Sequence, residues 1–264
     1  LTMSIIKGFE DTLEEKLSSI DGLIRVQNIF GKPISEKENL DSLIYRSGLP
    51  INVAPFIRGT AMIHKGKYTE GIIIEGVKEL PDKSYFKLDK KANYKDNIIL
   101  GKSLSSILDV GLNDQVIVTP LINTEKDFFR KKYNIIKVSG FFNSGMQEYD
   151  KAIAYVSIEK AKEIFQMDNQ ISGYVINSKL KMDVIIDGLD QHIKYPYYLE
   201  SWKDRHRIIF EWINIQRLPI IIIFGLIALV AITNIMATIS MIIREKNSQI
   251  GILMSQGMKL ADIR

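Results

Sequence analysis

The residues from Asn97 to Ser103 come nearest to a chemical motif. Their sequence, NIILGKS, ends in Gly-Lys-Ser, as does the loop that holds nucleotide phosphates. Position 96, where that loop needs its first glycine, is Asp96, and the residues before Gly101 are apolar and typical of a strand. We therefore interpret the segment as a surface turn that begins a helix. We expect this chain to bind neither ATP nor another cofactor by itself.

Metal and acid–base chemistry have no recognisable residue pattern. The histidines, His64, His192 and His206, stand apart and lack a second ligand at metal spacing. The carboxylates are interspersed with lysines, which predicts solvated faces. The absence of cysteine from the sequence excludes thiol catalysis, disulfides and zinc ribbons. The net charge of +4 is small and comes without a long basic block, so nucleic acid is not an expected partner. We expect no catalytic residues and no metal site.

The strongest physical signal is a run of 26 uncharged residues, Leu218 to Ile243. As a helix it would extend roughly 39 Å at about 1.5 Å per residue, more than the about 30 Å of a hydrocarbon core. Its 15 Ile, Leu, Val and Phe residues outweigh the few polar residues among them. Apolar runs inside globular proteins usually have only about 10 to 14 residues. We therefore predict a transmembrane helix.

The flanks of this run carry further signals. Ser201 to Asp204 (SWKD) is a capping-box pattern. One face of a stalk helix leading into the span would comprise Trp202, Ile209, Trp212 and Ile213. Pro219 predicts a kink or a new helix start. Basic residues flank both ends, so charge does not set the orientation. The apolar stub at residues 1–6 is interpreted as the end of an earlier membrane helix; a signal-peptide remnant is the alternative.

Helices and strands alternate at both ends of the segment before the span, and strands dominate its middle. Hydrophobic spacing predicts helices at 4–20, 35–45, 102–108, 158–165 and 182–193. It predicts strands at 23–30, 53–63, 68–76, 97–100, 115–120, 133–142, 152–156, 173–177 and 195–200, with a hairpin turn at Gly66-Lys67. This order predicts an α+β domain over 7–200. Its discontinuous α/β subdomain, at about 7–50 and 158–200, would carry an inserted β-rich subdomain at about 51–157.

A series of short motifs runs through nearly all 264 residues. They are Gly8–Glu10 (GFE), Val53–Gly59 (VAPFIRG), Ile99–Lys102 (ILGK), Gly140–Asp150 (GFFNSGMQEYD), and an ending with Glu245-Lys246, Ile250–Leu253 (IGIL) and Gly257. Their order and spacing resemble the LolC/LolE family of lipoprotein-releasing ABC permeases, part of a wider group of FtsX-like and MacB-like permeases. The match would run from the end of the first membrane helix to just after the second.

The resemblance implies a layout for the chain. Residues 1–6 would end the first transmembrane helix, 7–200 would form a periplasmic MacB-like core domain, and 201–217 a stalk helix. Residues 218–243 would cross the membrane, and 244–264 would be a cytoplasmic coupling segment that starts the FtsX-like permease domain. The full-length protein would be multi-pass in the bacterial inner membrane, with its large domain in the periplasm.

The resemblance also implies a function. The chain would be a non-catalytic permease subunit, paired with a second copy or a paralogue and with a separate LolD-like ABC ATPase. ATP hydrolysis in that partner would drive extraction of lipoproteins from the lipid bilayer and their transfer to a LolA-like periplasmic carrier.

The resemblance implies functional roles for three groups of residues, each placed by its position in the family's motifs. The segment that contacts the ATPase would comprise Glu245, Lys246, Ile250, Ile252, Leu253, Met254 and Gly257. A membrane-surface amphipathic helix is the alternative there, and Gln249 and Met254 depart from the family's polar pattern. The cavity for acyl chains would be lined by Ile5, Ile6, Ile220, Ile223, Phe224 and Ile227, although such residues often face lipid instead. The carrier would bind the 121–133 loop through Phe128, Phe129, Arg130, Lys131 and Lys132; the alternative is a plain solvated hairpin.

Two other functions remain open at this point. A MacB-like efflux permease would share the fold and the ATPase but deliver to an adaptor and an outer-membrane channel; the segment Gly145–Asp150 favours the lipoprotein-releasing family. A membrane-anchored sensor or scaffold would need no ATPase contact, and the coupling-like tail weighs against it.

Overall fold

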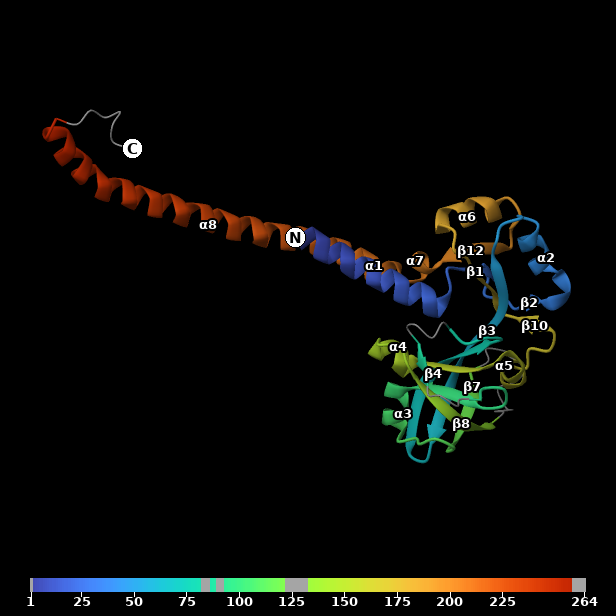
Figure 1. The fold of residues 1–264 in the computed structure, drawn as a ribbon. Helices are drawn as coiled ribbons and strands as arrows, with labels where there is room; N and C mark the ends of the chain where they lie inside the picture. Colours follow the sequence, from blue (N-terminus) through green and yellow to red (C-terminus); the bar gives the residue numbers. More distant parts are fainter. Residues whose placement is uncertain (1, 82–85, 89–92, 122–132, 258–264) are drawn as a thin grey trace. The chain divides into compact units, whose positions relative to one another are not determined.

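The computed structural model describes residues 2–81, 86–88, 93–121 and 133–257; within its helices, the side chains of 2–6, 9–11, 14, 213–214 and 217 lie outside the description. The chain divides into two compact units, which we call unit 1 (Leu1–Arg205) and unit 2 (His206–Arg264). Figure 1 shows the elements of both.

Among its described residues, unit 1 combines helices with one ten-stranded sheet and one two-stranded sheet, the latter made by β2 and β10. Its strands are β1 (Ile24–Asn28), β2 (Ile34–Ser35), β3 (Asn52–Lys65), β4 (Tyr68–Val77), β5 (Lys87–Leu88), β6 (Ile98–Gly101), β7 (Gln115–Pro120), β8 (Asn134–Asn143), β9 (Ile153–Ser157), β10 (Gln170–Ile171), β11 (Gly173–Asn177) and β12 (Tyr197–Ser201). Its helices are α1 (Thr2–Asp21), the 3-10 turn η1 (Glu36–Glu38), α2 (Leu40–Tyr45), α3 (Lys102–Leu108), α4 (Gln147–Ala152), α5 (Ile158–Phe165), α6 (Met182–Asp190) and α7 (Trp202–Arg205).

The pairing of six strands closes on itself. The main sheet has the order β12-β1-β11-β3-β4-β9-β6-β8-β5, and β7 pairs with both β3 and β8. The strands β3, β4, β9, β6, β8 and β7 therefore form a ring of ladders, a small β-barrel whose closure satisfies the backbone groups of its edges. In Figure 1, β12 lies beside α6, and the barrel strands lie beside α3, α4 and α5.

The long strand β3 belongs to both halves of unit 1. Its first residues, 52–56, pair with β11, and residues 56–65 pair with β4. Because strand side chains alternate, β4 places Ile72 and Ile74 in the main apolar core and Ile73 in a second cluster with Tyr155. Glu75 follows on the same side as Ile73, away from the barrel core.

The structure confirms the mixed α/β class, and several elements agree with their predicted bounds. The strands at 115–120 and 173–177 and the helices at 102–108 and 158–165 are observed as expected. The hairpin turn is also confirmed, since Lys65 pairs with Tyr68 and Gly66 has a φ of 56°. The sequence did not predict β2, β5, β10 or α4.

The helix expected at 35–45 is wrong as a single element. Ser35 ends β2, and its side chain caps the turn η1 by accepting a hydrogen bond from the Lys37 N–H. Asn39 then adopts a left-handed φ of 47°, which interrupts the helical hydrogen-bond ladder before α2 begins at Leu40.

The predicted stalk divides at His206. The capping box is confirmed, because Ser201 Oγ accepts from the Asp204 N–H at 3.1 Å while Asp204 Oδ2 accepts from the Ser201 N–H at 3.2 Å. The short α7 ends at Arg205, and Trp202 is buried in unit 1 with 1% of its surface exposed. Trp212 belongs to the next helix and is 60% exposed, so the two tryptophans do not share a helix face.

Unit 2 is one helix in its described part, α8 (Arg207–Ser255). Pro219 lies inside it, so the new helix start considered from the sequence does not occur there. A proline removes one N–H donor from the ladder, and the other hydrogen bonds of this 49-residue helix continue on both sides.

Candidate functional site

Five charged residues meet inside unit 1 and form a buried charge cluster: Asp21, Arg25, Arg58, Glu75 and Arg205. Asp21, Arg25 and Glu75 have only 2–3% of their surface exposed. The expectation that the carboxylates lie on solvated faces is therefore wrong for Asp21 and Glu75. Buried charges are tolerated where opposite charges and hydrogen bonds replace water, and the cluster supplies both.

Asp21 and Arg25 are brought together by the turn between α1 and β1. Gly22 follows the last residue of α1 with a φ of +75°, where a Cβ would also lie 2.2 Å from Val175 Cγ1. This turn lets the Arg25 guanidinium reach back to α1. Its Nη2 donates to Asp21 Oδ1 at 3.2 Å, and its Nε donates to the Asp21 carbonyl at 3.3 Å.

Glu75 enters the cluster through the register of the barrel strands. It lies opposite Arg58 on β3 and Tyr155 on β9. Its Oε1 accepts from both Nη atoms of Arg25 at 3.2 Å and lies 2.8 Å from Arg58 Nη1. Its Oε2 is buried and has no hydrogen-bond partner among the described residues.

Arg205, the last residue of α7, is held more loosely. Its Nε lies 3.8 Å from Asp21 Oδ2, and its Nη1 lies 3.7 Å from Glu200 Oε2. Both distances exceed hydrogen-bond range, and both nitrogens lack a hydrogen-bond partner within the described part of the chain. Only Nη2 donates, to the Gly22 carbonyl at 3.3 Å and the Asp21 carbonyl at 3.5 Å.

The pKa values of the two buried arginines, Arg25 and Arg205, shift in opposite directions. Burial works to lower the pKa of Arg25, but the charges of Glu75 and Asp21 outweigh it and raise that pKa above its ordinary value. For Arg205, burial and the charge of Arg25 lower the pKa to about 10. Both side chains are therefore protonated at neutral pH. Burial raises the pKa of Tyr149 well above its ordinary value, so its hydroxyl stays neutral and donates to Asp21 Oδ1 at 2.9 Å.

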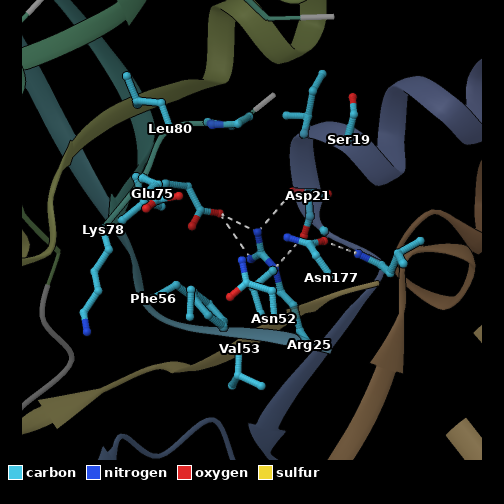
Figure 2. A pocket seen from close by; sticks show the side chains of 18 of the residues that line it. Ser19, Asp21, Arg25, Asn52, Val53, Phe56, Glu75, Lys78, Leu80 and Asn177 are labelled. Atoms are coloured by element: carbon cyan, nitrogen blue, oxygen red, sulfur yellow. Dashed lines mark hydrogen bonds and ion pairs between the residues drawn. The ribbon is translucent and has the colours of Figure 1, made fainter. Parts of the chain in front are cut away.

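A cavity of about 530 Å³ adjoins the cluster. Figure 2 shows Arg25 between Glu75 and Asp21, with Phe56 and Asn177 nearby on the wall. The Arg25 guanidinium lies 4.5 Å above the Phe56 ring, a cation–π contact that helps hold it in place. The cluster connects α1, β1, the barrel strands β3 and β4, and α7, so its chemistry is that of a joint between elements.

Sequence reasoning missed this cluster because its members are far apart in the chain. One signal was present: Glu75 is the single charge in the apolar run Ile72–Val77 (IIIEGV), where a buried carboxylate needs a cationic partner. Nothing local identifies Arg25 or Arg205 as that partner.

The Gly-Lys-Ser segment has a packing role. Residues 98–101 are buried in β6, and Gly101 is the residue before α3. A Cβ at Gly101 would lie 1.9 Å from the Asp150 carbonyl oxygen, so the glycine permits close approach of the α4 backbone. The expected helix start is observed; Gly101 is buried, whereas Lys102 is exposed at the surface. His64 Nδ1 contacts Thr69 Oγ1 at 2.8 Å, and His192 Nδ1 contacts the Gly188 carbonyl at 3.1 Å.

The other predicted site residues lie on α8 or outside the described residues. Leu218–Ser255 is long and apolar enough to cross a membrane, and its most apolar stretch is not buried by the described residues. Three predicted acyl-cavity residues on it are exposed: Ile223, Phe224 and Ile227. Ile220 is half-buried. The side chains of Ile5 and Ile6, and the whole predicted carrier-binding group at 128–132, are outside the described residues.

The predicted coupling residues occupy the end of α8. Ile250 and Leu253, three positions apart, are half-buried, whereas Ile252 and Met254 are exposed, as are Glu245 and Lys246. Gly257 follows the helix with a φ of 93° and donates its N–H to the Met254 carbonyl at 3.1 Å. A glycine in the left-handed region just after a helix is a common helix ending. Lys246 Nζ donates to Gln249 Oε1 at 3.1 Å within α8, and contact of this segment with an ATPase stays a prediction.

Curated relatives match the chain over nearly its whole length, although no family model matches it. The lipoprotein-releasing system transmembrane protein LolC of Xylella fastidiosa (strain Temecula1) is 23% identical over 279 residues, covering 99% of this chain and 66% of the relative. LolC of Neisseria meningitidis serogroup B is 20% identical, covering 100% and 66%. LolE of Haemophilus influenzae is 22% identical, covering 99% and 66%. This chain therefore spans about 66% of the length of these relatives.

Solved structures give a weaker likeness. The periplasmic region of MacB from Actinobacillus actinomycetemcomitans aligns with a TM-score of 0.47 and 13% identity, covering 74% of this chain and 97% of that chain. The sequence relatives confirm the resemblance that the motifs indicated. The chain is a homologue of the LolC/LolE family of lipoprotein-releasing system transmembrane proteins.

Proposed function

We propose that this chain is the permease subunit of an ABC-type complex that releases lipoproteins from the bacterial inner membrane. A separate ATPase hydrolyses ATP, and the permease uses the resulting motion to pass the lipoprotein to a periplasmic carrier. The observation that carries the proposal is the similarity to LolC and LolE proteins, which extends over 98–100% of this chain in four relatives. The apolar helix Leu218–Ser255 supports a membrane location.

In this proposal the two ends of the chain have different tasks. The end of α8 from Glu245 to Gly257 receives the motion of the ATPase, with Ile250 and Leu253 on the face that contacts it. Apolar side chains three and four positions apart on a helix present one face to a partner groove. Unit 1, on the periplasmic side, contacts the carrier, and the 121–133 loop is the proposed contact. A second permease subunit completes the membrane part.

Depletion of this permease in its native bacterium tests the proposal. We expect lipoproteins destined for the outer membrane to accumulate in the inner membrane, and a plasmid copy of the gene to restore their location. An efflux permease would behave differently, since its depletion would raise sensitivity to exported compounds and leave lipoproteins correctly placed. Normal lipoprotein location after depletion would therefore contradict the proposed function.

A further inference from the structure

The charge cluster contains buried polar atoms of both charge signs that make no hydrogen bond within the described part of the chain. Arg205 offers two buried N–H-bearing nitrogens, Nε and Nη1, without hydrogen bonds, and Glu75 offers the buried oxygen Oε2 without a donor, among the described residues. Buried polar groups in folded proteins are nearly always paired, so each exception needs a reason. In the same cluster Arg25 is fully engaged through Nε, Nη1 and Nη2.

Arg205 can move without leaving a carboxylate of the cluster unpaired. Asp21 accepts from Arg25 at 3.2 Å and from Tyr149 at 2.9 Å whether or not Arg205 approaches it. Glu200 likewise accepts from Gln27 Nε2 at 3.0 Å. The ion pairs of Arg205, at 3.7 and 3.8 Å, would become hydrogen bonds after a movement of about 1 Å, since charge-assisted bonds measure about 2.7–2.9 Å.

The turn whose carbonyls accept from Arg205 Nη2 borders a cavity. Asp21, Gly22 and Leu23, where α1 turns into β1, border the cavity of about 530 Å³, so this turn is not packed on that side. Arg205 ends α7, and only His206 separates it from α8, the helix that includes the predicted span. A displacement of α8 along its axis would therefore reach Arg205 first among the cluster residues in chain order.

We propose that Arg205 is a switchable latch between α7 and the end of α1. In the structure, only Nη2 of Arg205 forms hydrogen bonds among the described residues. When α8 moves α7 toward α1, Nε and Nη1 of Arg205 form hydrogen bonds with Asp21 and Glu200. Unit 1 then moves with the helix. The inference rests on the proposed function, because ATP hydrolysis in the partner supplies the motion. Packed interfaces with two discrete arrangements convert small displacements into such switches.

The test uses the full-length permease with its ATPase in a lipid bilayer. Spin labels are attached at Thr12→Cys on α1 and Lys203→Cys on α7, both exposed positions, and residues 1–264 contain no native cysteine to compete. The distance between the labels is measured without nucleotide and with a non-hydrolysable ATP analogue. We expect two distance populations whose ratio changes with nucleotide in the wild-type permease.

Three variants show whether Arg205 carries the switch. For Arg205→Gln we expect the nucleotide-dependent distance change to disappear and release to fall at least about tenfold, with ATP hydrolysis within about twofold of wild type. Arg205→Lys keeps the charge but not the planar fork, and should retain part of the distance change. Arg207→Gln is the matched control, since Arg207 is 74% exposed and pairs only with Glu211 among the described residues. It should behave as wild type.

Label distance and lipoprotein release together distinguish a failure of the latch from a failure of the proposed function. A wild-type permease that releases lipoprotein while its label distance stays fixed would overturn the latch and leave the function standing. Nucleotide-dependent movement without any release would contradict the function and support the latch. An Arg205→Gln variant that moves and releases like wild type would also overturn the latch. If that variant does not assemble, the wild-type distance measurement decides, because a single unchanged distance excludes a switch.

Discussion

Arg25 donates two hydrogen bonds of 3.2 Å, from Nη1 and Nη2, to the same oxygen of Glu75, which lies 50 residues away in the chain. The contact joins β1, in the half of the sheet that includes β11 and β12, to β4, a strand of the barrel. Both side chains are almost fully buried. Removing either partner would leave the other charge buried and unpaired, so this pair should dominate the stability of the joint.

The two buried arginines should therefore differ in their effect on stability. Arg25→Met is expected to lower the free energy of unfolding by about 3–5 kcal/mol, the usual cost of leaving a buried charge unpaired. Arg205→Met should not lower it, because the substitution removes only long ion pairs and also removes the cost of burying this charge, while the carboxylate partners keep other donors. Urea unfolding of the full-length permease in detergent measures both values. The fluorescence of buried Trp202 reports unfolding in a background in which Trp212 and any tryptophan outside residues 1–264 are replaced by Phe.

Equal losses in the two variants would show that Arg205 is a structural residue like Arg25, and would weaken its assignment as a latch. A Glu38→Gln variant is a suitable control, since Glu38 is exposed on the short turn η1. It should leave the unfolding midpoint unchanged.

The lowered pKa of Arg205 predicts a pH dependence. Its pKa of about 10 in the folded chain lies below the ordinary value of an arginine, so between these two values the unfolded chain binds more protons than the folded chain. By linkage, the stability of the folded state must rise with pH across this window, and the penalty for burying the charge is fully present below it. The difference in unfolding midpoint between wild type and Arg205→Met should shift in favour of wild type from about pH 8 to about pH 10.5. A shift in the opposite direction would contradict the assigned pKa.

Membrane insertion of α8 gives a third prediction. Ile232 lies near the middle of the uncharged run 218–243, and an aspartate at a helix centre costs about 2.5–3.5 kcal/mol on insertion scales. Ile232→Asp should therefore reduce the fraction of permease that resists carbonate extraction. The control Ser248→Asp, beyond the uncharged run, should extract like wild type. Release of the wild-type permease by carbonate without detergent would contradict the assignment of the span.

Much of the fold was predictable from local patterns, and the joint was not. The strand Gln115–Pro120 and the helix Ile158–Phe165 have spacing that decides their type and bounds without tertiary context. Closure of the barrel depends on β7 pairing with both β3 and β8, a long-range relationship that no local pattern encodes. The β3–β4 hairpin alone places Arg58 opposite Glu75. The rest of the charge cluster is long-range, because Arg25 comes from β1 and Arg205 from α7, and no local pattern brings them to these strands.

The coupling segment provides a fourth prediction. Leu253→Asp places a charge on the half-buried face shared with Ile250 at the end of α8. If this face seats against the ATPase, the variant should co-purify with less ATPase and lose lipoprotein release, while unit 1 keeps its fold. Burial of two such side chains would contribute about 3–6 kcal/mol to the contact. Ser248→Asp, an exposed position one turn earlier, is the matched control. Wild-type co-purification and release by Leu253→Asp would show that the face is only a surface of the helix.

The most direct test of the proposed function is ATP-dependent release in a defined system. The full-length permease and its ATPase are reconstituted into vesicles together with a fluorescent triacylated lipoprotein, and the soluble carrier is added outside on the periplasmic face. We predict that ATP transfers the lipoprotein to the carrier in the soluble fraction, and that a non-hydrolysable analogue does not sustain repeated transfer. Steady ATP hydrolysis by the assembled complex with all of the lipoprotein retained in the vesicles would contradict the account.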